Sequence, residues 1–359
     1  MVQLGGEGLL IKYLIKRAIF FIKLFVLNLK LLILKPFQYL SFSIVKFLPK
    51  KVILTYDNGV VLDGIGAQFQ RIFAIRALAD NLLFDYLHTG LKDITTHPLD
   101  PFQSSNDRKE YVNKLNDFLS FCNSNLEILK SSKLVEVDRI SINLRYLIHI
   151  SIKSILLNRI YLLKIVEPYD IIDLRPDFYL SIQKHFNTKS KFKPIHKSNV
   201  DMVLHYRRGV GNYAIYGNQT ISRELPESYY HNLFLELTKE FHLNRKSKIV
   251  VLTDSPINSM KYFPPKDQLG IWEDSPRFKN GVMYISAFDS KKVFQELSEK
   301  VEIICGGDPL NSLLNMANAQ ILVLSRSSFS YVAAILNSSG VIYAAPNFWH
   351  KKLKHWREI

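Results

Sequence analysis

The sequence predicts an α/β protein whose C-terminal half is a parallel, doubly wound sheet. From residue 201 onward, short runs of branched apolar residues alternate with helical patterns, which is typical of such a sheet. The chain has 359 residues, 47% apolar and 22% charged, enough for two globular domains with cores of their own. We expect a basic apolar segment at 1–50, an N-terminal α/β domain at 51–200 and a C-terminal α/β domain at 201–359.

The N-terminal segment is both apolar and basic. Residues 1–51 carry nine basic residues and one acid, a net of +8 out of +15 for the whole chain. Lys16, Lys23 and Lys30 are seven residues apart, so a helix would place them in one stripe beside apolar faces. This pattern favours membrane attachment over a buried core helix. Whether the segment spans the bilayer or lies on it stays open. The free-energy cost of inserting the lysines nearly cancels the free energy gained by inserting the apolar residues.

The N-terminal domain begins with a strand at 51–56, a glycine-bearing turn and a helix at 68–83. A polar helical segment at 107–121 and an apolar stretch at 144–163 follow. The lysine-rich residues 184–199, which include Pro194, suggest a linker to the C-terminal domain.

The C-terminal domain alternates strands with helices. The expected strands are 201–206, 248–253, 301–305, 320–325 and 340–345. The expected helices are 226–241, 256–262, 309–319 and 328–336. Ligands bind such sheets at the carboxyl ends of the strands, so we look for chemistry in the residues that follow each strand.

Two adjacent arginines follow the first strand of this domain. Arg207 and Arg208 are costly at a strand end unless an anion pairs with them, and Gly209 and Gly211 would let backbone amides approach that anion. This order of residues favours a phosphate site. A surface arginine pair on an ordinary loop is the alternative.

Polar residues also follow the later strands. Asp254 and Asp308 could each accept hydrogen bonds from a ribose or a base, or cap the helix that comes next. Ser327 and Ser328 stand at the start of a helix, where hydroxyls and free amides bind phosphate well. An ordinary serine N-cap is the simpler alternative there.

Several familiar motifs are absent. Gly64, Gly66 and Gln68 form a glycine turn at a helix start, but Phe69 breaks the dinucleotide fingerprint G-x-G-x-x-G. The sequence has no Walker-type phosphate loop, no H-E-x-x-H and no Asp-x-Asp pair, so we expect no metal. Only two cysteines occur, Cys122 and Cys305, which excludes a disulfide scaffold and a cysteine-built zinc site.

The motifs taken in order resemble the fucosyltransferase superfamily. The order is G-x-G-x-Q, H-x-R-R, T-D, G-G-D, and S-S-F-S before A-A-I-L. The likeness is nearest to the family 11 α-1,2-fucosyltransferases and more distant to the α-1,6-fucosyltransferases. It covers residues 56–83 and 201–349, and the intervening stretch matches nothing recognisable.

The resemblance implies a GT-B fold, in which two Rossmann-like domains face a cleft. It also implies an inverting, metal-independent transfer of fucose from GDP-fucose to a glycan hydroxyl. Arg207 would bind the diphosphate, Arg208 would support it and His205 would lie against the nucleotide. The other donor-binding residues would be Asp308 at the guanine or ribose, Ser327 and Ser328 at a phosphate, and residues 64–68 closing the cleft.

One departure from the family leaves the donor and the base open. The family usually has an acid two places after the second arginine, where this chain has Val210. Another nucleotide sugar, or a non-catalytic relative, therefore remains an alternative. For the general base we expect Glu224, with Glu227, Asp57 and Asp63 as alternatives.

Partners and location follow from the charge distribution. A nucleic-acid-binding protein would carry its basic excess across the body, whereas here much of it lies in the N-terminal segment, so we expect no nucleic-acid partner. We expect the cytoplasmic face of a bacterial membrane. A type II Golgi protein is the alternative, since Asn218 and Asn337 begin formal glycosylation sequons.

Overall fold

The structure is a computed structural model, and it describes most of the chain from residue 41 onward. The described residues are 41–48, 51–59, 63–121, 133–188, 200–207, 213–216, 219–222, 224–244, 246–269, 278–285, 287 and 301–358. The expected membrane segment up to residue 40 lies outside them, as do Arg208 and Val210. Within the described part, no helix is long and apolar enough to cross a membrane.

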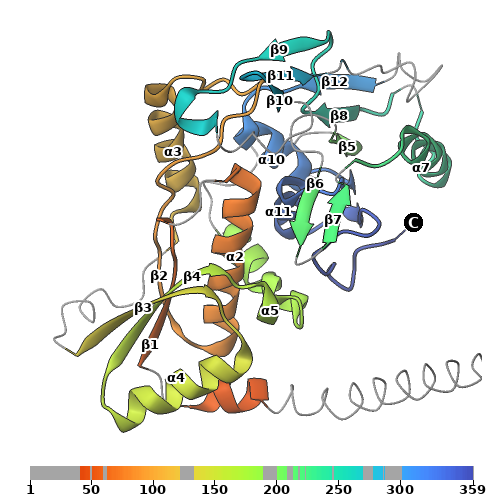
Figure 1. The fold of residues 1–359 in the computed structure, drawn as a ribbon. Coiled ribbons are helices and arrows are strands. Elements are labelled where there is room, and N and C mark those ends of the chain that lie inside the picture. The colour runs from red at the N-terminus through yellow and green to blue at the C-terminus, as the bar shows by residue number, and fades with distance from the viewer. Residues whose placement is uncertain are drawn as a thin grey trace, which may run out of the picture.

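The N-terminal half, residues 51–188, is built on a parallel four-stranded sheet (Figure 1). Its strands lie in the order β2-β1-β4-β3. They are β1 (Val52–Tyr56), β2 (Asp85–Leu87), β3 (Leu134–Ser141) and β4 (Ile160–Glu167). The helices are α2 (Ile65–Leu82), α3 (Ser105–Leu119), α4 (Leu144–Leu156), α5 (Tyr169–Ile172) and α6 (Leu180–Thr188), with a 3-10 turn at Pro176–Tyr179.

The C-terminal half, residues 200–358, contains a parallel five-stranded sheet in the order β12-β8-β5-β13-β14. The strands are β5 (Met202–Tyr206), β8 (Ile249–Thr253), β12 (Val301–Cys305), β13 (Ile321–Val323) and β14 (Val341–Tyr343). The helices are α7 (Glu227–Glu240), α10 (Pro309–Ala317) and α11 (Ser328–Leu336). In chain order these strands read 3-2-1-4-5, the Rossmann arrangement, and the order reverses between β5 and β13.

Short elements complete this half. They are the antiparallel sheet of β9 (Met260–Tyr262), β10 (Phe278–Lys279) and β11 (Val282–Ile285), the hairpin of β6 (Tyr213–Tyr216) and β7 (Gln219–Ser222), and a 3-10 turn at Lys266–Gln268. The fold is thus α/β with two parallel sheets, consistent with a pair of Rossmann-like units.

The expected strands of both sheets are confirmed to within a few residues, but three expectations differ from the structure. Residues 256–262, expected as a helix, instead lead into β9, because Tyr262 is buried by pairing with Met283 of β11. The apolar stretch 144–163 divides into α4 and β4 at Asn158, whose φ is 50°. The expected linker begins later, since residues 184–188 belong to α6.

The two halves are packed against each other over one continuous hydrophobic core. Helix α2 lies alongside α11 (Figure 1), and a Cβ on Gly66 would stand 2.4 Å from the backbone nitrogen of Phe329. A second close approach lies between Gly306, whose φ is +70°, and Leu99. A Cβ added to Gly306 would stand 2.3 Å from the Cβ of Leu99. At both places only glycine fits without a shift of the neighbouring half.

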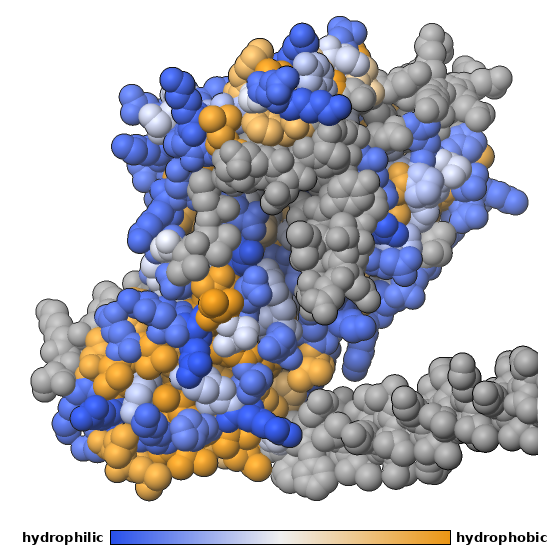
Figure 2. Space-filling model, viewed as in Figure 1, coloured by the Kyte–Doolittle hydropathy of each residue, from blue (hydrophilic) through white to orange (hydrophobic). Residues whose placement is uncertain are grey.

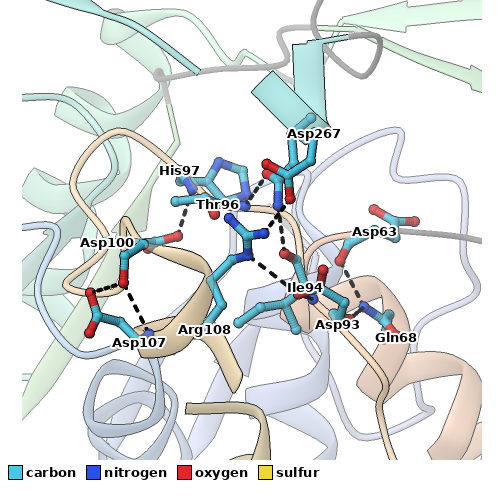
Figure 3. A network of polar contacts seen from close by, with 12 residues as sticks. Asp63, Gln68, Asp93, Ile94, Thr96, His97, Asp100, Asp107, Arg108 and Asp267 are labelled. Atoms are coloured by element: carbon cyan, nitrogen blue, oxygen red, sulfur yellow. Dashed lines mark hydrogen bonds and ion pairs between the residues drawn. The ribbon is translucent and has the colours of Figure 1, made fainter. Parts of the chain in front are cut away.

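Polar contacts reinforce this interface (Figure 3). The buried Arg108 of α3 reaches Asp93 of its own half at 3.4 Å and also pairs with Asp267 of the C-terminal half. The side chain of Gln268 accepts from the backbone nitrogen of Thr96 at 2.8 Å and donates to the carbonyl of Ile94 at 3.1 Å. The loop before α3 is therefore held firmly against the C-terminal half.

Candidate functional site

The candidate site lies where the strand order reverses, at the carboxyl ends of β5 and β13. Two residues at the end of β5 meet two residues that follow β13. His205 Nδ1 is 2.7 Å from the hydroxyl of Ser325, and Arg207 donates from Nη1 to the hydroxyl of Ser327 at 3.3 Å. The fold thus brings together the arginine motif and the serine motif, which are about 120 residues apart in the sequence.

Ser327 is the N-cap of α11. Its φ and ψ of −144° and 129° are extended, and its hydroxyl accepts from the backbone nitrogen of Phe329 at 3.3 Å. The buried Ser330 donates to the carbonyls of Ser325 and Ser327, at 3.3 and 3.2 Å, which fixes the turn that precedes the helix. Ser328 is half-buried at the first helical position. A guanidinium beside a helix N-terminus makes this point attractive to an anion.

His205 is buried and neutral. Burial lowers its pKa to about 4; the charge of Asp254 works in the opposite direction and Arg207 lowers it further. Its ring lies edge-on to Phe329 with centroids 6.0 Å apart. His205 therefore supports the site by packing and hydrogen bonding, and positive charge comes from Arg207 and from α11.

The two expected aspartates occupy different positions. Asp254 follows β8, the strand beside β5, and is half-buried near His205. Asp308 caps α10 and accepts from Tyr111 and Lys114 of the N-terminal half. Although burial raises the pKa of Asp308, these hydrogen bonds bring it below its usual value. Each carboxylate oxygen of Asp308 thus already accepts a hydrogen bond from the N-terminal half.

The glycine turn lies beside the serine motif. Gly64 is the N-cap of α2, and Gly66 abuts Phe329, two residues after Ser327. The buried Gln68 donates to the carbonyls of Asp63 and Asp93 at 2.8 and 2.9 Å, so its amide ties the loop to α2.

The carboxylates proposed from the sequence as general bases lie in different parts of the structure. Asp63 pairs with Arg71 at 3.0 Å, and Asp57 accepts from the backbone nitrogen of Gly59 at 3.0 Å. Glu224 is half-buried in the segment that leads into α7, and Glu227 is the first residue of that helix.

Asp100 is a carboxylate that the sequence reasoning missed. It lies on the loop that meets the C-terminal sheet, where the carbonyl of the preceding Leu99 accepts from Gly307 at 3.4 Å. Asp100 Oδ2 accepts from the backbone nitrogen of His97 at 2.6 Å (Figure 3). Burial raises the pKa of Asp100 to about 7; the His97 hydrogen bond lowers it and the nearby Asp254 raises it. An aspartate before Pro101 predicts only a turn, so no sequence signal could have found it.

The described residues contain no group of three or more His, Cys, Asp or Glu side chains placed to hold a metal ion.

Comparisons with known proteins give only remote structural likenesses. No protein-family model matches the sequence, and a search of curated proteins finds no relative. The fold is similar to POFUT1 in complex with GDP at 11% identity and a TM-score of 0.40, covering 84% of this chain and 98% of that one. It is also similar to the E. coli heptosyltransferase WaaC with ADP-2-deoxy-2-fluoro heptose at 10% identity and a TM-score of 0.34, covering 87% and 93%.

Proposed function

We propose that this chain is a glycosyltransferase that binds a nucleoside diphosphate sugar between β5 and β13. The observation that carries the proposal is the contact of Arg207 with Ser327 at the point where the strand order reverses. A guanidinium and the N-terminus of α11 converge there, and both favour the oxygens of a diphosphate. The motif order in the sequence supports the same site.

The chemistry follows from where charge develops. When the bond between the sugar and the diphosphate breaks, the leaving group gains negative charge, so a fixed arginine binds the transition state more strongly than the donor. Arg207 is held by Ser327 before any donor arrives, which preorganises it. Arg207 and α11 supply the positive charge that a metal ion supplies in other transferases.

The finer proposal is an inverting transfer of fucose from GDP-fucose to a glycan hydroxyl. It is supported by the resemblance of residues 203–209 and 321–349 to the fucosyltransferase motifs. Inversion needs a base that takes the proton of the acceptor hydroxyl as the new bond forms. Asp100 suits this role alongside Glu224, because it lies near Asp254 of the C-terminal half and has a pKa near 7.

Donor binding by the full-length chain tests the proposal. We expect GDP and GDP-fucose to raise the melting temperature, with no effect of EDTA, and UDP-sugars and GDP-mannose to give smaller shifts. Arg207→Ala should weaken binding about 30-fold or more, because it removes a charged partner of the diphosphate. Arg139→Ala, which removes an exposed arginine from β3, is the matched control and should bind normally.

Each other outcome changes a defined part of the proposal. A shift with a UDP-sugar or GDP-mannose that exceeds the shift with GDP-fucose would keep the class and replace the donor. No response to any nucleotide would remove the transferase function. Equal binding by Arg207→Ala and the wild type would remove the arginine motif from the site.

A further inference from the structure

Helix α4 is apolar on both sides. Leu144, Leu147 and Ile150 face the core together with two serines, and further large apolar side chains lie on the outside. Ser151 and Ser154 are fully buried, and Ser154 donates back to the carbonyl of Ser151 at 2.7 Å. On the opposite side Ile152 is 42% exposed, Ile155 41% and Leu156 77%. A helix that packs one face against a core carries polar residues on its outer face, so the exposed apolar residues of α4 need another explanation.

The helical residues 41–47 add a second exposed apolar face. Phe42 and Val45 pack into the core, whereas Ile44 and Phe47, on the other side, are 41% and 83% exposed. Lys51 donates to the side chain of Asn158, just past α4, and this bond joins the two segments. Figure 2 shows apolar atoms gathered at the lower end of the molecule, where α4 and residues 41–47 lie in Figure 1.

We call this surface the apolar rim. Its members share high exposure and a position at this end of the N-terminal half. They are Ile44, Phe47, Ile152, Ile155, Leu156 and Leu157. Single exposed apolar residues are common on soluble proteins, but a gathered set of large ones marks a surface that binds something apolar.

The two segments that carry the apolar rim have no acidic residues. Residues 142–163 contain no aspartate or glutamate, and neither do residues 41–51. Arg145 is exposed two turns before Ile152 on the same helix face, and Arg159 is exposed just after α4. Apolar side chains flanked by cations are the pattern of helices that lie in the headgroup region of a bilayer.

We propose that the apolar rim is a membrane-docking surface that binds anionic lipid. Its exposed side chains enter the boundary between headgroups and acyl chains, and its cations meet the negative lipid charge. The proposal is independent of the glycosyltransferase function, since no residue of the apolar rim belongs to the candidate site between β5 and β13.

Lipid photolabelling of the full-length chain tests the docking surface directly. Vesicles of phosphatidylcholine and phosphatidylglycerol would carry a phospholipid with a diazirine in its acyl chain. After tryptic digestion, peptide 154–159 reports on α4, and peptide 224–239, with the 44% exposed Leu235, is the matched apolar control. We expect about tenfold more label on 154–159 than on the control peptide, and Arg145→Gln should reduce the label on 154–159 about fivefold.

A substitution separates docking from folding. Ile155→Ser with Leu156→Ser alters only exposed side chains, so the melting temperature should be unchanged while the labelling of α4 falls to the control level. Label in residues 1–40 with none above control in 154–159 would overturn the proposal. The proposal would also be overturned if the wild type self-associated without lipid and the double variant did not. That result would assign the surface to a second copy of the chain.

Discussion

Two titratable residues near the candidate site respond to pH in opposite directions. The folded pKa of His205, about 4, is below its usual value of 6.5, so its contribution to stability is complete above pH 6.5 and is lost as the pH falls toward 4. The folded pKa of Asp100, about 7, is above its usual 3.8, so its contribution is complete below pH 3.8 and is lost as the pH rises to 7.

Asp100→Asn separates catalysis from stability. If Asp100 is the base, the wild-type rate rises with pH through about 7 as the carboxyl ionises, and the variant loses this limb together with about 100-fold or more of the rate. The same change should stabilise the fold at pH 8 and have little effect at pH 4, because asparagine resembles the protonated acid. Rate profiles and thermal melts across this range measure both effects.

Asp117→Asn is the control for that variant. Asp117 is exposed on α3, so neither its rate profile nor its stability should change. A stabilised Asp100→Asn enzyme that kept a normal rate would leave Asp100 as a buried structural acid and return the assignment to Glu224.

The contact between α2 and α11 depends on one glycine. Alanine at position 66 would gain about 1 kcal/mol in helix propensity. Its Cβ would nevertheless stand 2.4 Å from the backbone nitrogen of Phe329, which cannot rotate away. We expect Gly66→Ala to lower the unfolding free energy by about 1–3 kcal/mol. It should also weaken nucleotide binding, because Ser327 moves with the start of α11.

The neighbouring glycine provides the control for this element. A Cβ on Gly64 would meet only His97, at 3.4 Å, which is ordinary contact. Denaturant unfolding should therefore show a much smaller change for Gly64→Ala. Equal losses in the two variants would mean that backbone freedom, and not the contact with α11, explains the glycines.

Local pattern was enough to predict the five strands of the C-terminal sheet and β1 of the N-terminal sheet, but not β2, β3 and β4. Strands such as β1, β5 and β8 are fully buried runs, and caps such as Ser327 mark helix starts in sequence. The position of Asp100 could not be predicted, because it depends on a contact between Leu99 and Gly307 from opposite halves. The strand β9 was missed for the same reason, since its partner β11 lies about twenty residues away.

At the scale of the whole molecule, Arg108 connects the two halves from a buried position. Arg108→Met keeps the apolar stem and removes the bonds to Asp93 and Asp267, which should cost about 1–3 kcal/mol. Hydrogen exchange should then accelerate at Gln268 and Leu310, where the C-terminal half meets this loop.

An arginine that is paired within one half is the control. Arg76 pairs with Asp80 at 2.8 Å inside α2, so Arg76→Met should lower stability without faster exchange at Gln268 and Leu310. If both variants accelerated exchange there equally, Arg108 would have no special part in joining the halves.

The continuous core has a consequence for the independence of the halves. Phe329 lies against Gly66, and Tyr179 of the N-terminal half lies edge-on to Tyr331 of α11 with ring centroids 6.0 Å apart. Either half made alone would present such side chains to water and would tend to aggregate. A chain cut between residues 188 and 200 should instead stay together, with both halves still bound to each other. The two sheets are therefore gained or lost as one unit.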